Sequence, residues 1–429
     1  MTAAPIPARE ATRLSELSPQ QWKSGVAAWL GWMFDGLELH LYTLVAAPLV
    51  LQLLATTAAD PQVKEKSAYI QGAFLVGWAV GGAFFGRLGD LLGRSRALSL
   101  TVLTYAVCTG LCAFAQTWWQ LMIFRFIAAV GIGGEWAVGA SLLSETWPKA
   151  WRPWLAAVLQ TGVNIGVLGG AVFVGLLMTY MPPGSERWVF LIGVIPAFLV
   201  FYIRRHVPEP EAWAKAEAEA AVGHRNPGAR ELFRGDILST TIRTTLVCAL
   251  GLSAWWLYLF WQTQHLRRLL GEAHTPAAEV TGLVSAAFFA FNFASIIGNF
   301  GGGWLAKRFG NRPAIVVLFT GLAASMFGAF IVPRGFSELA WFWLPIGGFF
   351  GGVFGLFTMY LPPLFPVLLR TTGAGFCYNI GRIAAAIASI VFGWLAPVGD
   401  FRTALLYSSS LAAAAALASL YLPKDVKDA

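Results

Sequence analysis

Long apolar stretches separated by short polar connections recur along nearly the whole chain. They fall near 24–54, 68–89, 97–116, 119–145, 154–180, 188–204, 244–265, 280–304, 313–333, 340–366, 372–396 and 403–422. A helix that crosses the hydrocarbon core of a bilayer needs about 20 apolar residues, and nearly all of these stretches are that long. The pattern therefore predicts an all-α membrane protein with twelve transmembrane helices. Residues 1–22 are polar and have no apolar core, so we expect no signal peptide.

Composition agrees with this pattern and argues against other classes of protein. Hydrophobic residues make up 57% of the 429 residues and charged residues 12%, whereas a soluble domain carries roughly 25% charge. The net charge of +8 is scattered among the connections, which gives little support to nucleic-acid binding. The five histidines are dispersed, and no Ser/His/Asp arrangement, paired metal ligands or phosphate loop is evident. We therefore expect neither an enzyme nor a metal site, and no cofactor.

Two polar connections about half the chain apart have similar sequences. Residues 86–96 read GRLGDLLGRSR and residues 303–312 read GWLAKRFGNR, at an offset of 217 residues. A second repeated segment, Asn-Ile-Gly at 164–166 and again at 379–381, has an offset of 215 residues. Such repeats indicate a duplicated six-helix unit. The predicted bundles span residues 1–205 and 244–429, joined by a polar linker at 206–243, and paired halves of this kind are common among transporters.

Lysine and arginine are divided unequally between the two sides of the predicted membrane protein. The even-numbered connections and the two ends of the chain hold 21 of them, and the opposite side holds 7. The positive-inside rule places the basic side in the cytosol. We therefore expect a multi-pass protein of the inner or plasma membrane with both termini in the cytoplasm.

Five ionisable side chains lie inside predicted spans, where each is unfavourable unless it has a partner or faces a cavity. Asp35 and Glu38 share one face of the first span because they are three residues apart. Arg125 and Glu135 lie in the fourth span and Arg382 in the eleventh. Three acids against two bases leave one acid without a cation, and burial disfavours the charged form of a carboxyl group. The unpaired acid is expected to carry a proton; the alternative is a set of fixed salt bridges that lock the fold.

The segments around these residues resemble the major facilitator superfamily. Residues 86–96 are similar to its loop motif between helices 2 and 3, and residues 125–136, RFIAAVGIGGEW, resemble its helix 4 motif. The GGEW core followed by SETWP at 144–148 is similar to the metabolite:proton and sialate:proton symporter branches. FDGLE at 34–38 and YNIGR at 378–382 resemble the acidic helix 1 motif and the helix 11 motif of organic-acid symporters.

This resemblance implies alternating access and proton-coupled transport of an organic acid. It implies proton coupling by Asp35, Glu38 or Glu135. Gating or structural roles are expected for Gly86, Asp90, Gly93, Arg94, Arg125, Glu145 and Arg152.

Two positions depart from the superfamily's patterns. Lys307 stands in the second loop copy where the first has Asp90, so the contacts made by the two loops are not expected to be symmetric. Val167 replaces a proline of the antiporter signature in the fifth span, which argues against drug:proton antiport.

Arg382 offers a planar fork that fits a carboxylate group, and with its neighbours Tyr378 and Asn379 it indicates an anionic substrate. Further candidates for substrate contact are Trp255, Trp256, Tyr258, Gln262, Asn292, Tyr360, Gln160 and Asn164. Two alternatives stay open for them. Tryptophans can instead anchor a helix at the membrane surface, and buried amides often join helices.

We therefore expect a monomeric secondary active transporter that imports an organic acid anion with a proton. The acid is a monocarboxylate, an aromatic acid or a sugar acid resembling sialic acid. The alternatives are an antiporter or uniporter of the same fold for a sugar or drug-like solute, an integral membrane enzyme, and a receptor that does not transport.

Overall fold

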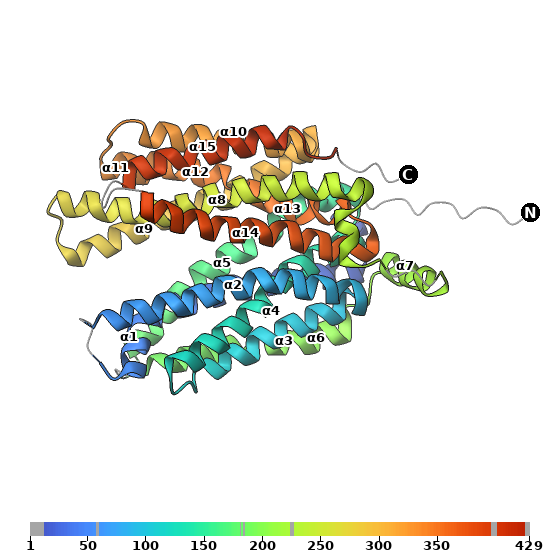
Figure 1. Cartoon of the computed structure of the whole chain (residues 1–429), viewed down its shortest axis with the longest axis horizontal. Coiled ribbons are helices and arrows are strands. Elements are labelled where there is room, and N and C mark those ends of the chain that lie inside the picture. Colours follow the sequence, from blue (N-terminus) through green and yellow to red (C-terminus); the bar gives the residue numbers. More distant parts are fainter. Residues whose placement is uncertain are drawn as a thin grey trace, which may run out of the picture.

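The computed structural model describes residues 13–56, 60–180, 182, 185–223, 227–395 and 401–424. Within these ranges the chain forms helices and turns, and no strand. Figure 1 shows the helices running lengthwise in two lobes, the first built from α1 to α6 and the second from α8 to α15. The ends of the predicted bundles, residues 1–12 and 425–429, lie outside the described residues.

The long helices of each lobe begin and end at the polar connections of the sequence. The first lobe comprises η1 (Leu14–Glu16), α1 (Pro19–Leu54), α2 (Pro61–Leu92), α3 (Arg94–Cys112), α4 (Trp118–Thr146), η2 (Lys149–Trp151), α5 (Arg152–Tyr180), η3 (Glu186–Val194) and α6 (Ala197–His206). The linker contains α7 (Glu211–Val222) and η4 (Ala229–Phe233). The second lobe comprises α8 (Gly235–Glu272), α9 (Ala277–Phe309), α10 (Asn311–Phe330), α11 (Phe336–Glu338), η5 (Leu339–Trp343), α12 (Leu344–Phe350), α13 (Val353–Tyr360), η6 (Pro362–Leu364), η7 (Val367–Leu369), α14 (Arg370–Leu395) and α15 (Phe401–Ser419).

Ten helical segments of the described residues are long and apolar enough to cross a membrane. The other two predicted spans, 24–54 and 372–396, fall on α1 and α14, each of which includes residues whose side chains are not described. The predicted span 340–366 extends too far. Its helix ends at Tyr360 because two prolines follow at 362 and 363, and proline has no N–H to continue the helix.

Short polar side chains set the starts of several helices. The Thr117 hydroxyl accepts a hydrogen bond from the Gln120 N–H at the start of α4. Asp60 does the same at α2, where its Oδ1 accepts from the Gln62 N–H at 2.9 Å. This backbone hydrogen bond, followed by one from Thr56, holds the pKa of Asp60 below its ordinary value.

One end of the molecule carries the linker, and we call it the linker end. The linker helix α7 projects there beside the turn between α2 and α3 (Figure 1). Trp213 of α7 donates from Nε1 to the Asp90 carbonyl at 3.0 Å. Glu209 accepts hydrogen bonds from the N–H groups of Ser95 and Arg96 at 3.1 and 3.0 Å, which caps the start of α3. The linker is therefore attached to the first copy of the repeated loop.

The sequence repeat is also a repeat of backbone conformation. Gly93, between α2 and α3, has φ +99°, and Gly310, between α9 and α10, has φ +89°. Residues other than glycine rarely adopt such angles. Both loop copies therefore turn at the same point, which supports the alignment that places Asp90 opposite Lys307.

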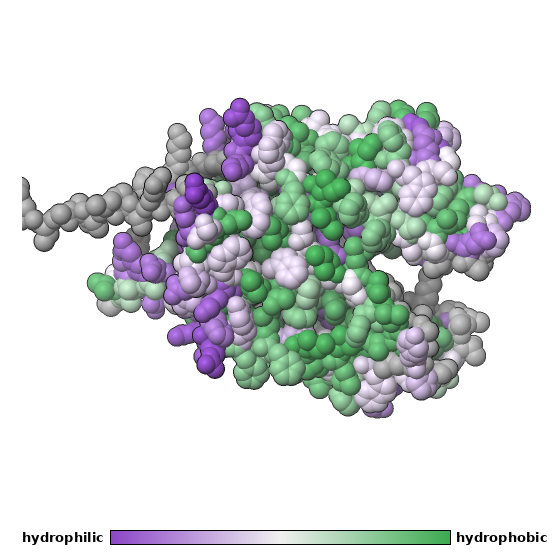
Figure 2. Space-filling view, turned by 180° about the vertical axis from the view of Figure 1, so that it is seen from behind, coloured by the Kyte–Doolittle hydropathy of each residue, from purple (hydrophilic) through white to green (hydrophobic). Residues whose placement is uncertain are grey.

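The lobes meet along two seams, α2 against α14 and α5 against α9. Glycines permit the close approach, because a side chain at Gly82 would collide with Asn379 and one at Gly303 with the Pro153 carbonyl. Figure 2 shows apolar residues covering the middle of the molecule, polar residues at its ends, and a hollow between the lobes away from the linker end. The lobes are thus closed at the linker end and separated at the other.

Candidate functional site

Arg382 lies on α14 at the first seam, between two aromatic rings. Its Cζ is 4.0 Å from the ring centre of Trp78 on α2 and 4.8 Å from that of Tyr378. Nη1 donates to Oδ1 of Asn379 at 2.7 Å, the one side-chain hydrogen bond that Arg382 makes with the described residues. The side chain is only half-buried. Nε and Nη2 are therefore left for a ligand that enters between the lobes, in the geometry that suits a carboxylate.

Aromatic side chains from both lobes surround this guanidinium. Tyr378 stacks on Trp136 of α4, with ring centres 4.0 Å apart and planes at 10°. Trp78 meets Trp256 of α8 edge to face, with ring centres 6.2 Å apart. The predicted candidates Tyr378, Asn379, Arg382 and Trp256 thus lie together, and flat apolar faces adjoin the cation.

Asp35 on α1 and Glu135 on α4 are neighbouring acids in the first lobe. Both carboxylate oxygens of Glu135 and Oδ1 of Asp35 are buried and lack a hydrogen-bond partner among the described residues. Gly31 makes room for them, because a side chain there would collide with the Glu135 carboxylate. Arg382 lies near enough to attract Asp35 electrostatically. Since burying an unpaired charge is costly, at least one of the two acids is expected to hold a proton in this state.

Glu38, the third predicted acid, is paired. Arg125 of α4 donates from Nη1 to Glu38 Oε1, and the Thr109 hydroxyl donates to the same oxygen at 2.8 Å. The side chains of Glu38 and Arg125 are each 1% exposed. This ion pair uses one acid and one base of the five ionisable residues inside the predicted spans. The other three are Asp35, Glu135 and, across the seam, Arg382.

Breaking this pair is expected to destabilise the protein. Arg125→Gln leaves Glu38 buried without a cation, which typically costs about 3–5 kcal/mol. The double variant Arg125→Gln with Glu38→Gln removes the stranded charge and should recover much of that loss. Melting in detergent measures both variants, and a double variant no more stable than the single one would contradict a charge-pair role.

Two other aromatic candidates of α8 pack inside the second lobe. The Trp255 ring centre is 5.4 Å from that of Phe291 and 5.3 Å from that of Phe354. Tyr258 is fully buried, with its ring centre 5.8 Å from that of Phe291. Trp255 and Tyr258 therefore belong to the core of the lobe, and of the three aromatic candidates on this helix only Trp256 reaches Trp78.

The remaining polar candidates are divided between unpaired and paired groups. Asn164 and Gln262 are buried, and each has one amide atom without a partner among the described residues. Asn292 donates to the Phe288 carbonyl of its own helix at 2.8 Å. Tyr360 donates to the Pro423 carbonyl at 2.6 Å and lies at the linker end.

Asn299 of α9 is absent from the sequence-based candidates. It is 1% exposed, and neither its Oδ1 nor its Nδ2 has a partner among the described residues. It lies beside Gly355 of α13, where Gln160 of α5 approaches from the first lobe. A lone amide in an apolar span was the signal that selected Asn292, and the same signal would have found Asn299. Tyr105, buried beside Glu135, is likewise absent from those candidates.

Asp90 closes the first seam at the linker end. Its carboxylate accepts hydrogen bonds from the N–H groups of Thr371 and Thr372, at 3.2 and 2.8 Å, and from the Thr372 hydroxyl at 2.5 Å. These groups lie in the first turn of α14, where a negative charge is favourable. Arg94 donates to the same carboxylate at 2.9 Å, and Gly86 lets α2 approach the Thr371 carbonyl. An acid of the first lobe therefore caps a helix of the second.

Arg94, whose side chain is fully buried, extends this contact into a network. It donates to both carboxylate oxygens of Glu145, at 3.1 and 2.9 Å, and to the Val367 carbonyl at 2.6 Å. Arg370 of the second lobe donates to Glu145 at 3.2 Å. The sequence-predicted residues Asp90, Arg94 and Glu145 thus lie together and join the two lobes.

Asp90→Asn should weaken the closed linker end, because it removes the charge shared by Arg94 and the first turn of α14. We expect transport to fall while substrate affinity in detergent changes modestly. Spin labels at the exposed positions Arg96 and Arg308 should report a larger population of long distances between the lobes. Asp236→Asn, the same change at an exposed acid of the second lobe, is the control. An Asp90→Asn protein with the parent's transport and distances would remove this acid from gating.

Residues 28–361 match the family model of the Major Facilitator Superfamily, which is more than half of the chain. The chain belongs to the Major Facilitator Superfamily. It is 26% identical over 393 residues to the cis,cis-muconate transport protein of Acinetobacter baylyi, covering 90% of each chain. It is 26% identical over 383 residues to the sialic acid transporter NanX of Escherichia coli, covering 88% of this chain and 87% of that one. Among solved structures, the proton:xylose symporter XylE superposes with a TM-score of 0.77 at 16% identity, covering 94% of this chain and 96% of the other.

Membership of the Major Facilitator Superfamily makes this chain a multi-pass membrane transporter and not an enzyme. The likeness to XylE supports the fold alone. The relatives named for muconate and sialic acid carry small organic anions.

Proposed function

We propose that this chain imports an organic acid anion together with a proton across the inner or plasma membrane. The observation that carries the proposal is the position of Arg382, half-buried between the lobes with two nitrogens left for a ligand. A second observation is the neighbouring acid pair, Asp35 and Glu135, which lacks hydrogen-bond partners for three of its oxygens. A cation for the anion and an acid for the proton are thus within electrostatic reach of each other.

The aromatic faces around Arg382 favour a substrate with a planar or extended carbon skeleton. Trp78 and Tyr378 lie on two sides of the guanidinium, so the carboxylate would bind the fork while the skeleton packs against the rings. The names of the muconate and sialic acid relatives agree with this class of substrate.

Coupling follows because the Asp35 carboxylate and the substrate carboxylate would compete for one cation, Arg382. In this structure Arg382 attracts the Asp35 carboxylate. A bound substrate carboxylate would neutralise Arg382, so the acid pair would bind a proton more readily. By linkage, a proton on the pair would in turn free Arg382 and strengthen substrate binding. Anion and proton are therefore taken up together.

Alternating access would rock the bundle of residues 1–205 against that of residues 244–429, with twelve helices in the membrane. Because the lobes meet at the linker end and are separated at the other (Figure 2), access to the site would be from the side opposite the linker. The linker end carries the larger share of lysine and arginine, so we place it, with both termini, in the cytosol. Both lobes and the whole site come from one chain, so a monomer suffices.

Uptake into proteoliposomes tests the substrate class. The panel would include a labelled dicarboxylate, an aromatic monocarboxylate, a sugar acid and neutral xylose, with protein-free liposomes as the control. We expect saturable uptake of at least one acid and none of xylose. Uptake of xylose without uptake of any acid would contradict the proposal.

A further inference from the structure

Tyr105 is a fully buried tyrosine in the middle of α3. Its side chain is 0% exposed, and its hydroxyl lacks a hydrogen-bond partner among the described residues. Burying a hydroxyl without a partner is costly, and phenylalanine would fill the same space without that cost. We therefore expect this hydroxyl to meet a hydrogen-bond acceptor in another state of the transport cycle.

The packing of α3 on α4 directs the Tyr105 side chain toward Glu135. The short turn at 113–117 makes α4 run back along α3, so the two helices are antiparallel (Figure 1). Gly131 of α4 permits their close approach, because a Cβ atom there would lie 2.8 Å from the Tyr105 nitrogen. Helical side chains lean toward the N-terminus of their own helix. From Tyr105 that direction leads along α4 from Gly131 to Glu135, one turn further on, and the two side chains interact.

A second hydroxyl on the same face of α3 already serves a buried acid. Thr109 follows Tyr105 by four residues, so their side chains share one face of the helix. The Thr109 hydroxyl donates to Oε1 of Glu38 at 2.8 Å. This face of α3 thus presents two hydroxyl groups to the acids of the first lobe, and Glu135 is the acid that lies beside Tyr105.

The Glu135 carboxylate has an oxygen available for this donor. Both of its oxygens lack a hydrogen-bond partner among the described residues. When Asp35 holds the proton of the acid pair, its single O–H can donate to only one of them. The other oxygen can accept from Tyr105, because a phenol keeps its proton at neutral pH and remains a donor.

The charged and titratable groups that face the acid pair come from three helices. They are Glu38 of α1, Tyr105 of α3, and Arg382 of α14 with Tyr378 beside it. Residues 70–86 of α2, which also packs against α4, include no titratable side chain. Glu38 is paired with Arg125, and Arg382 acts on Asp35. Tyr105 is therefore the donor best placed for Glu135.

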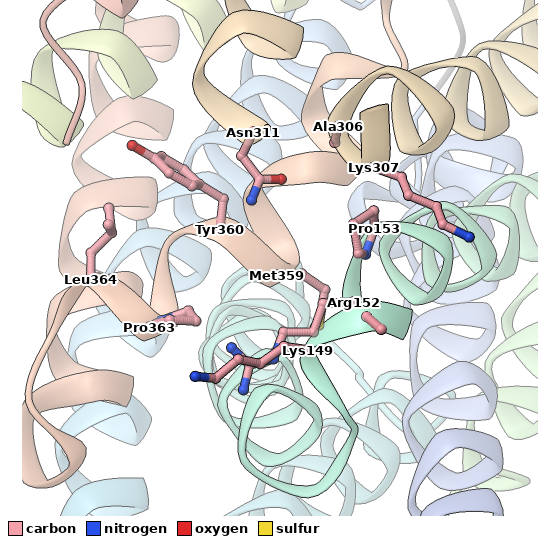
Figure 3. Close-up of a pocket in the computed structure, with 11 residues that line it drawn as sticks. Lys149, Arg152, Pro153, Ala306, Lys307, Asn311, Met359, Tyr360, Pro363 and Leu364 are labelled. Carbon is pink, nitrogen blue, oxygen red and sulfur yellow. The ribbon is translucent and has the colours of Figure 1, made fainter. Parts of the chain in front are cut away.

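The polar groups of the linker end belong to a different part of the molecule. Tyr360 of α13 and the cations Lys149 and Arg152 line a separate pocket there (Figure 3). Helix α4 ends eleven residues beyond Glu135, at Thr146, which is roughly 16 Å further along the helix. We therefore expect these groups to have little influence on the protonation of Glu135.

We propose that Tyr105 is a positioning residue for the transported proton, and that its hydroxyl donates a hydrogen bond to the Glu135 carboxylate when that group ionises. A hydrogen bond to the charged form of an acid favours that form, so it helps Glu135 to release its proton. Tyr105 keeps its own proton and acts on the coupling through Glu135, without touching the substrate. This role rests on the proposed proton coupling and adds a residue that sets the pH of proton release.

Infrared titration of Tyr105→Phe in detergent tests the hydrogen bond directly. The full-length protein without substrate is titrated with acid, and the C=O band of the protonated Glu135 carboxyl group is assigned by its loss in Glu135→Gln. Without the donor the ionised form is less stable, so the midpoint pH of this band should rise. We expect a rise of about one pH unit or more, since a hydrogen bond to a charged group changes an equilibrium about tenfold.

Tyr258→Phe is the matched control. It removes a hydroxyl of the second lobe that is equally buried and equally without a partner among the described residues. Its infrared midpoint should equal that of the parent. In proteoliposomes, Tyr105→Phe should accumulate the transported acid more slowly than the parent and exchange it at the parent's rate, because only net uptake requires Glu135 to lose its proton.

A midpoint equal to the parent's, or below it, would overturn the role of Tyr105. The proposed symport has its own test in proteoliposomes, so the two can fail separately. Proton-coupled uptake by the parent with an unchanged midpoint in Tyr105→Phe would remove Tyr105 alone. Uptake without proton entry, together with a raised midpoint in Tyr105→Phe, would contradict symport while the hydrogen bond stands.

Discussion

Glu135→Gln should abolish the accumulation of substrate driven by a pH gradient. The Glu135 carboxyl group is fully buried and neither of its oxygens has a partner among the described residues, so its charge depends on whether it holds a proton. Glutamine has nearly the same shape and stays neutral throughout the transport cycle. Exchange of labelled for unlabelled substrate should survive, because exchange can proceed with the site held in its neutral form. Asp35→Asn should behave in the same way if the two acids share one proton.

Two further variants make this result interpretable. Glu272→Gln changes an exposed acid that pairs with Arg268 and should leave accumulation intact. Glu38→Gln tests the third candidate, and because Glu38 is paired with Arg125 we expect it to affect stability more than coupling. If Glu38→Gln alone abolished accumulation while exchange survived, the proton would travel through the ion pair instead. If all three acid variants still accumulated substrate, proton symport would be the wrong mechanism.

Arg382→Lys should weaken substrate binding about tenfold or more, because a charge-assisted hydrogen bond contributes about 1.5–3 kcal/mol and lysine cannot supply the second arm of the fork. The positive charge remains, so the protein should fold and Asp35 should keep its attraction to the second lobe. Titration calorimetry or the protection of melting temperature by substrate measures the change.

The matched control is Arg402→Lys. Arg402 also lies in the second lobe, where its Nη1 donates to the Phe330 carbonyl at 2.9 Å, so the same substitution there should leave affinity unchanged. Parent-like affinity in Arg382→Lys would remove this arginine from the substrate site.

The helical architecture could be predicted from the sequence because membrane helices are recognisable as long apolar stretches between polar connections. The repeated loop was equally informative, since its turning glycines, Gly93 and Gly310, share the same unusual backbone conformation. The charged residues inside spans were also recognisable, because so few occur there. Periodicity places two residues on one helix face but does not say which neighbouring helix they meet. Hence the pairing of Glu38 with Arg125, which leaves Asp35 and Glu135 together, required the structure.

The sequence also could not show how deep in the membrane a residue lies or which neighbour its side chain faces. The predicted span 340–366 included Tyr360 as a candidate for substrate contact, whereas the helix ends at this residue and its hydroxyl contacts the Pro423 carbonyl. Trp255 and Trp256 are adjacent in sequence, yet one packs in the core and the other contacts Trp78 across the seam. Trp136 belongs to a recognised motif, but its stacking on Tyr378 depends on the approach of the two lobes. None of these contacts leaves a pattern along the chain.

The most direct test of proton-coupled import measures anion and proton movement together in one set of proteoliposomes. A pH-sensitive dye inside the vesicles would record proton entry while a labelled organic acid is added outside, first without and then with an inward proton gradient. Proton-coupled import predicts that the acid alone acidifies the interior through the transporter, that the gradient drives accumulation of the acid, and that Glu135→Gln loses both effects. Saturable uptake of the acid with no proton entry and no response to the gradient would contradict it.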